Sequence, residues 1–115
     1  MEYFVYILYS ESLQRFYIGQ TNDVGQRFKR HNSGTEKYTS KGVPWELVWF
    51  TSKESRSDAM ILEKKLKNLK QLRLVKFMQK YTSGIQNIQI INMLEKKWSY
   101  NRVSDDHDNF VMISE

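Results

Sequence analysis

Two apolar runs stand close together near the start of the chain, and each alternates between two faces as a strand does. Residues 3–9 have the sequence Tyr-Phe-Val-Tyr-Ile-Leu-Tyr, and residues 15–19 have the sequence Arg-Phe-Tyr-Ile-Gly. β-Branched and aromatic residues favour strands, and the polar break between the runs has the length of a hairpin loop. We therefore expect two antiparallel strands. Because successive side chains point to opposite faces, Tyr6 and Tyr17 are expected side by side, with Gly19 ending the second strand.

A third strand is expected from Trp45 to Thr51, directly after the single proline of the chain. The alternation assigns Trp45, Leu47 and Trp49 to one face and Glu46, Val48 and Phe50 to the other. Both faces are largely apolar, which is typical of a strand that is covered on each side. We therefore expect this strand to be central in the sheet, with both tryptophans in the core.

Helices are expected after the hairpin and after the third strand. Thr21 or Asn22 can cap the first helix, with Asp23 near its positive end, and Ser33-Gly34 ends it. Ser55 caps the second helix, which ends near Asn68. The apolar stripe of the second helix consists of Ala59, Leu62, Leu66 and Leu69. A third helix is expected over residues 70–81.

A fourth helix is expected beyond a break at residues 82–84. Its apolar positions recur at steps of three and four, at Ile85, Ile88, Ile91, Leu94 and Trp98. This helix either packs back on the domain or forms a surface for a protein partner or a homodimer. An acidic, polar stretch follows, with Asp105, Asp106, His107 and Asp108, and residues 110–113 are apolar again and can add an edge strand.

The order strand, strand, helix, strand, helix, helix predicts an α+β fold, a three-stranded antiparallel sheet flanked by helices. We assign this domain to residues 1–83 and a C-terminal helical extension to residues 84–115. A length of 115 residues with 40% hydrophobic residues suits one core. No apolar run is long enough to cross a membrane, and the N-terminus lacks the pattern of a signal peptide.

Composition limits the chemistry. The chain has no cysteine, so disulfides and thiolate metal sites are excluded, and a cytoplasmic location is expected. We find no zinc-ligand spacing, phosphate-binding glycine loop or Ser-His-Asp arrangement. Residues 23–80 hold fourteen basic and six acidic residues, whereas residues 81–115 hold three and five. A basic middle region favours a polyanionic partner, although a mild basic excess is also common among proteins without one.

Three polar residues lie beside apolar stripes of the expected helices. Arg27 flanks the stripe of the first helix, and His31 follows one turn later. Glu63 flanks the stripe of the second helix, one turn before Lys67. Each has an ordinary interpretation: a surface arginine with a buried stem, a histidine at a helix C-terminus, and a solvated partner of Lys67.

The expected topology also allows a second interpretation, in which Tyr6, Tyr17, Arg27 and Glu63 meet on one face. Hydrolysis of a phosphodiester bond needs such groups. Water must be oriented and deprotonated, the charge on the phosphoryl oxygens must be neutralised, and a carboxylate must hold a divalent metal ion.

The segments Phe4-Val5-Tyr6 and Tyr17-Ile18-Gly19 resemble the two half-motifs of the GIY-YIG nuclease family, including the spacing between the two tyrosines. The chain is most similar to the small stand-alone members. The resemblance covers residues 3–80. Phe4 replaces the first glycine of the family name, and Gln20 stands where some repair-type members have a lysine near the phosphate.

The resemblance implies a role for each matching residue. Tyr6 matches the general base, Tyr17 matches the tyrosine that orders water and phosphate, and Arg27 matches the arginine that holds the scissile phosphate. His31 matches an auxiliary residue. Glu63 matches the sole protein ligand of one metal ion, Mg2+ or Mn2+. The products would carry 5′-phosphate and 3′-hydroxyl ends.

The resemblance implies a metal-dependent DNA endonuclease, with a setting in DNA repair or recombination, in the cytoplasm and at the nucleoid if the source is bacterial. RNA is not excluded as a substrate. Cations that can contact nucleic acid are Lys29, Arg30, Lys41, Lys67 and Lys70. The alternative function is a binding module for nucleic acid or a protein partner, on the same scaffold and without catalysis.

Overall fold

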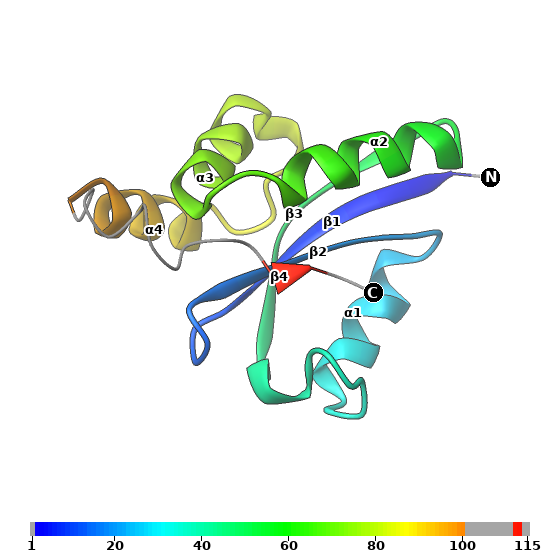
Figure 1. Cartoon of the computed structure of the whole chain (residues 1–115), viewed down its shortest axis with the longest axis horizontal. Coiled ribbons are helices and arrows are strands. Elements are labelled where there is room, and N and C mark those ends of the chain that lie inside the picture. Colours follow the sequence, from blue (N-terminus) through cyan, green and yellow to red (C-terminus); the bar gives the residue numbers. More distant parts are fainter. Residues whose placement is uncertain (1, 101–111, 114–115) are drawn as a thin grey trace.

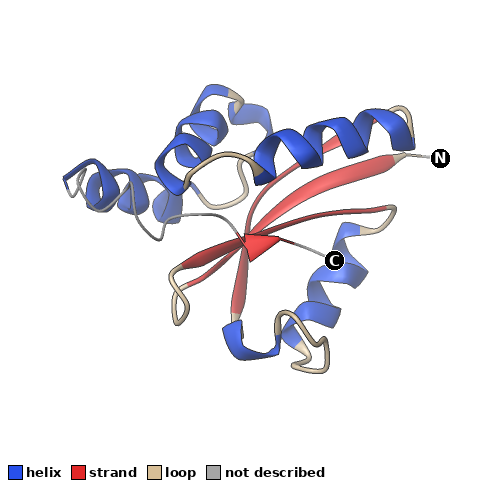
Figure 2. Cartoon of the chain, in the orientation of Figure 1, coloured by secondary structure: helices blue, strands red, loops and turns tan. Residues whose placement is uncertain are grey.

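The computed structural model describes residues 2–100 and 112–113, and it has the predicted α+β fold (Figures 1 and 2). The strands are β1 (Tyr3–Ser10), β2 (Arg15–Thr21), β3 (Trp45–Lys53) and the two-residue β4 (Met112–Ile113). The α-helices are α1 (Val24–Asn32), α2 (Arg56–Lys67), α3 (Gln71–Lys80) and α4 (Ile88–Tyr100), with 3-10 helices η1 (Ser40–Gly42) and η2 (Thr82–Gly84). The predicted element order and the antiparallel three-stranded sheet are confirmed.

The central strand is β1, so the prediction that the third strand lies in the centre is wrong. The order in the sheet is β3-β1-β2-β4, with β2 and β3 antiparallel to β1 and β4 parallel to β2. The outer edge of β3 is covered by the chain that follows η2: the N–H of Gln86 donates to the carbonyl of Val48 at 2.9 Å. The apolar composition of β3 reflects the burial of both its faces, since Trp49 packs in one apolar cluster and Trp45 in another.

A bulge in β3 also corrects the predicted alternation. Ile7 pairs with Trp49 but Leu8 pairs with Leu47, so Val48 is an extra residue in the ladder. Both tryptophans are buried as predicted, but Trp45 packs with the cluster around Tyr6 and Trp49 packs on the opposite face. A one-residue insertion reverses the face of every later side chain, and alternation alone cannot reveal it.

The sheet separates two apolar clusters. Helices α2 and α3 lie on one side of the sheet and α1 lies on the other (Figure 1). The larger cluster joins Val5, Ile7, Tyr9, Phe16 and Ile18 of the hairpin to residues of α2, α3 and α4. The smaller cluster holds Tyr6, Leu8, Tyr17 and Trp45, with Val24 and Phe28 of α1 packed against it. The hairpin faces predicted from the alternation are confirmed, and both tyrosines face α1.

The two predicted helix starts have different outcomes. Ser55 caps α2 as predicted, since its hydroxyl accepts the N–H of Asp58 at 3.0 Å. The cap of α1 is Asp23, and the prediction of Thr21 or Asn22 is wrong. The carboxylate of Asp23 accepts the N–H of Gln26 at 3.0 Å, while Thr21 accepts the N–H of Asp23 at 3.1 Å. Because β2 runs on to Thr21, the helix begins later than the sequence indicated.

Helix α4 packs back on the domain. Ile91, Leu94 and Trp98 belong to the larger cluster, and Lys76 of α3 pairs with Glu95 at 2.6 Å. Ile88 is 48% exposed, so its assignment to the buried stripe is wrong. The division at residues 83–84 and a partner or homodimer surface on the extension stay predictions.

The predicted edge strand is present at Met112–Ile113, whereas the acidic stretch from Asp105 to Asp108 and residues 110–111 lie outside the described residues. None of the helices in the described part of the chain combines the length and apolarity needed to span a membrane.

Candidate active site

The predicted site residues meet at one cavity of about 350 Å³. It lies at the α1 side of the hairpin and is lined by Tyr6 of β1, Tyr17 of β2, Arg27 and His31 of α1, and Glu63 of α2. These five residues are distant in sequence but line one volume, and the roles that the resemblance implies for them stay predictions.

The two tyrosines are fixed by the antiparallel register of β1 and β2. Their side chains are 1% and 3% exposed, and their ring centroids are 6.2 Å apart. Gly19 is the direct cross-strand partner of Tyr6, and a Cβ at Gly19 would lie 2.6 Å from the Tyr6 hydroxyl. Gly19 therefore provides the space for the Tyr6 ring. It does not end β2, which continues to Thr21.

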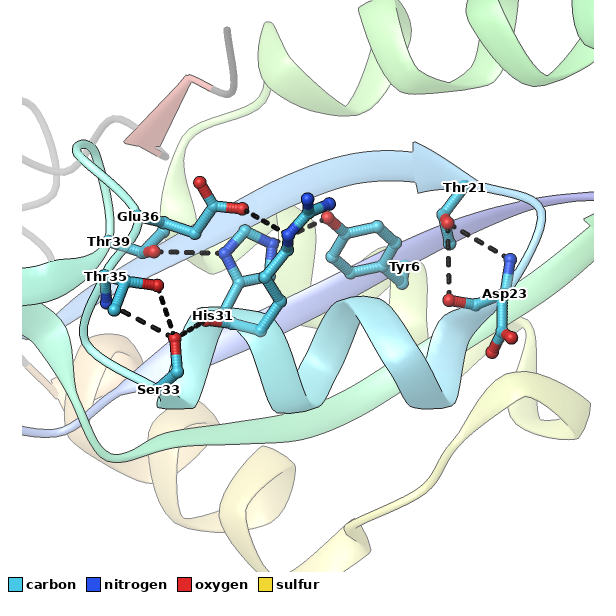
Figure 3. Close-up of polar contacts among 9 residues, drawn as sticks. Tyr6, Thr21, Asp23, His31, Ser33, Thr35, Glu36 and Thr39 are labelled. Carbon is cyan, nitrogen blue, oxygen red and sulfur yellow. Dashed lines mark hydrogen bonds and ion pairs between the residues drawn. The ribbon is translucent and has the colours of Figure 1, made fainter.

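His31 links the hairpin to the loop after α1. Its Nε2 lies 2.8 Å from the Tyr6 hydroxyl and its Nδ1 lies 3.0 Å from the Thr39 hydroxyl, so the ring bridges the two oxygens (Figure 3). The side chain is 2% exposed. Burial lowers the pKa of His31 to about 4, helped by the charge of Arg27. The ring is therefore neutral at neutral pH, although His31 does lie in the last turn of α1 as its ordinary interpretation expects.

The phenol of Tyr6 is protonated at neutral pH. Burial and the neighbouring Tyr17 raise the pKa of Tyr6 well above its usual range. Arg27 acts in the opposite direction, through its charge and a hydrogen bond to the tyrosine side chain. Tyr6 thus lies between a cation that favours its ionisation and an apolar environment that opposes it.

Glu63 reaches the cavity from α2 and is held on both carboxylate oxygens. The side-chain amide of Gln20 donates to Oε1 at 2.9 Å, and the Lys67 ammonium lies 2.9 Å from Oε2. The pairing with Lys67 agrees with the ordinary interpretation of Glu63, but the side chain is only 13% exposed and is not solvated.

The donor set around Glu63 fits a hard divalent cation. Its carboxylate already accommodates a positive charge and faces a cavity with room for water and phosphate oxygens. Within residues 2–100 no group of three histidine or acidic side chains could form a closed metal site. Mg2+ usually keeps several waters and takes one or two carboxylates, so a single glutamate suits it.

The predicted nucleic-acid contacts lie outside the cavity. Lys29, Arg30 and Lys41 are exposed, and Arg30 pairs with Glu36 at 3.3 Å. Lys67 and Lys70 are partly buried, and Lys67 is engaged by Glu63. Lys29, Arg30 and Lys41 are therefore accessible to a phosphate backbone.

The sequence did not single out several lining residues. Thr39 and Glu36 come from the loop after α1, and Arg56 comes from the first turn of α2. Arg56 precedes Glu63 by seven residues, a spacing that returns to the same helix face, and this signal could have identified it. Nothing in the polar loop distinguishes Thr39, which is 1% exposed and bonded to His31.

Acidification is expected to destabilise the fold through His31. Between about pH 7.5 and pH 5, His31 binds a proton in the unfolded chain but stays neutral in the folded protein, where its pKa is about 4. The free energy of unfolding therefore falls by about 2 kcal/mol as the pH falls through this range. Urea denaturation of the parent and of His31→Gln at several pH values measures this term. His31→Gln should not show this fall of about 2 kcal/mol in the free energy of unfolding. An equal fall in both proteins would contradict a buried neutral imidazole.

The fold and the cavity define a small α+β domain with a candidate active site. Residues 2–81 match the family model described as the GIY-YIG catalytic domain, and the chain therefore belongs to the GIY-YIG family. The family predicted from the two half-motifs is confirmed. The match ends close to the last residue of α3 and leaves α4 outside.

Proteins from three bacteria are similar to this chain. A UPF0213 protein of Streptococcus pneumoniae serotype 4 is 32% identical over 72% of this chain and 81% of its own length. A UPF0213 protein of Pediococcus pentosaceus is 32% identical over 64% of this chain and 78% of its own length. The solution structure of a UPF0213 protein from Bacillus halodurans shares 34% identity, covers 69% of this chain and 84% of that one, and has a TM-score of 0.46. These names state no activity.

Proposed function

We propose that the protein is a metal-dependent DNA endonuclease that hydrolyses phosphodiester bonds in the cavity. The observation that carries the proposal is the convergence of Tyr6, Tyr17, Arg27 and Glu63 from four separate elements on one partly enclosed volume. A module that only binds nucleic acid needs cations on its surface, but it does not need two buried tyrosines and a carboxylate beside them.

Arg27 and Tyr17 position the scissile phosphate. The guanidinium is planar and always charged, so it can bind phosphate oxygens through two hydrogen bonds and neutralise the charge that grows on them during attack. Tyr17 packs against His31 at a centroid distance of 4.6 Å, so its ring has a fixed place at the cavity wall. Its hydroxyl can then hold a phosphate oxygen or the attacking water in one orientation.

Tyr6 and His31 handle the proton of the attacking water. With the proton of His31 on Nδ1 and donated to Thr39, Nε2 accepts the hydroxyl proton of Tyr6. A lone pair of the Tyr6 oxygen is then available to the water in the cavity. As the water loses its proton to Tyr6, the tyrosine passes its own proton toward Nε2, so the phenol need not be ionised beforehand.

Glu63 would hold one Mg2+ or Mn2+ ion. When bound, the metal supplies positive charge next to the leaving oxygen and the phosphate. Gln20 keeps the orientation of the Glu63 carboxylate through its hydrogen bond to Oε1. The exposed Lys29, Arg30 and Lys41 would bind the phosphate backbone on either side. We place this activity in the cytoplasm, in DNA repair or recombination.

A cleavage assay tests the proposal. The purified protein is incubated with plasmid, flap, branched and single-stranded DNA and with RNA, in Mg2+ or Mn2+ and with excess EDTA as control. We expect cleavage of at least one DNA substrate that EDTA abolishes, with 5′-phosphate ends. Binding of DNA without cleavage of any substrate would contradict the proposal and would favour a non-catalytic binding module. Cleavage of RNA alone would also contradict it, because the substrate would then be RNA and not DNA.

A further inference from the structure

Both oxygens of the proposed metal ligand are already engaged within the described structure. Gln20 binds Oε1 of Glu63 and the Lys67 ammonium binds Oε2, each at 2.9 Å. The Glu63 and Lys67 side chains are 13% and 19% exposed, so neither charge is fully hydrated. A metal ion that takes Glu63 as its ligand must therefore bind a carboxylate that a protein cation already neutralises.

Gln20 and Lys67 interact with the Glu63 carboxylate in different ways. The amide of Gln20 is neutral, and its hydrogen bond is compatible with a metal ion on the other carboxylate oxygen. The ammonium of Lys67 is a full positive charge, and it would lie within a few ångströms of a divalent ion on the same carboxylate. Repulsion at that distance in a partly buried site is strong, so the metal and Lys67 compete for Glu63.

Lys67 is able to leave. It lies in the last turn of α2, four residues after Glu63, and its side chain ends on a flexible four-carbon stem. The C-terminal carbonyls of a helix favour a positive charge, so the released ammonium retains a favourable environment nearby. Release of the Lys67 ammonium would break its ion pair with Glu63 but would not require any change in the backbone.

We propose that Lys67 is the internal counter-cation of Glu63, which the metal ion displaces on binding, and that this exchange sets the metal affinity of the site. The inference rests on the proposed function, because it takes Glu63 as the metal ligand. It also gives a new role to Lys67, which the sequence suggested as a solvated partner of Glu63 or as a nucleic-acid contact. In the metal-free protein the ion pair neutralises the charge of a partly buried carboxylate.

The test measures Mn2+ binding by isothermal titration calorimetry, without DNA. Lys67→Met removes the charge and keeps the stem, and Lys67→Arg keeps a cation that can pair with Glu63. Lys64→Met removes the same charge from an exposed position of the same helix. We expect Lys67→Met to bind Mn2+ about five- to tenfold more tightly than the parent, since a partly buried ion pair is lost from the competing state. Lys67→Arg and Lys64→Met should stay within about twofold of the parent.

The outcomes separate this inference from the proposed function. If the parent and Lys67→Met bind Mn2+ equally, or if Lys67→Met binds more weakly, the competition is refuted and the proposed function is not affected. An equal gain in Lys64→Met and Lys67→Met would also refute it, because the effect would then be one of net charge. If the parent and all variants fail to bind Mn2+, both the inference and the metal site are refuted. Thermal unfolding of each variant confirms that it is folded.

Discussion

Replacing Glu63 with glutamine is expected to reduce metal-dependent cleavage by about a thousandfold or more, a loss of roughly 4 kcal/mol of transition-state stabilisation. The amide is isosteric with the carboxylate, and its oxygen can still accept the hydrogen bond from Gln20. It carries no charge, so it is a poor ligand for Mg2+ and has no ion pair with Lys67. Single-turnover cleavage at saturating DNA measures the loss.

The fold should survive this substitution, because an uncharged amide is easier to bury than a carboxylate. Circular dichroism and thermal unfolding of Glu63→Gln check that it does. Glu46→Gln is the matched control: it makes the same chemical change at an exposed position of β3 that does not line the cavity. Its rate should stay within about twofold of the parent. Unchanged cleavage by Glu63→Gln would remove Glu63 from the metal site.

Tyr6→Phe is expected to lower the cleavage rate by about 10²- to 10⁴-fold, the usual contribution of a general base. The substitution keeps the ring, which packs against Tyr17 and His31, and removes only the hydroxyl that contacts Nε2. The lost hydrogen bond should cost about 1 kcal/mol of stability, too little to unfold the domain. The rate is measured under single-turnover conditions with Mg2+.

Tyr9→Phe provides the control for this experiment. Tyr9 lies on the same strand, is equally buried, and packs in the larger cluster on the opposite face of the sheet. Its hydroxyl has no hydrogen-bond partner among the described residues, so removing it should leave stability and cleavage nearly unchanged. A Tyr6→Phe variant that cleaves as fast as Tyr9→Phe would show that the Tyr6 hydroxyl has no part in the reaction.

The sequence predicted those features of the fold that depend on local pattern. Alternation in β1 and β2 assigned Tyr6 and Tyr17 to one face, because both strands are regular and the hairpin loop is short. Ser55 was recognised as a cap because its bond to Asp58 spans three residues. The half-motifs identified the family, and with it five of the residues that line the cavity.

The features that the sequence did not predict depend on contacts between distant segments. The bulge at Val48 is visible only from the pairing of β3 with β1. The contact of Gln20 with Glu63 joins residues 43 positions apart, and no periodicity marks it. Thr39 lies in a polar loop of ordinary composition, and its contacts with His31 and Trp45 form only in the folded protein. Tertiary packing decides each of these.

The cavity lined by Tyr6, Tyr17, Arg27 and Glu63 is the proposed site of DNA hydrolysis. The most direct test compares Mg2+-dependent DNA cleavage by the parent and by Glu63→Gln, purified in the same way so that a contaminating nuclease would be present in both. If the proposal holds, the parent cleaves DNA and the variant shows no cleavage above background. Equal cleavage by the two preparations, or no cleavage by the parent on any DNA, would contradict it.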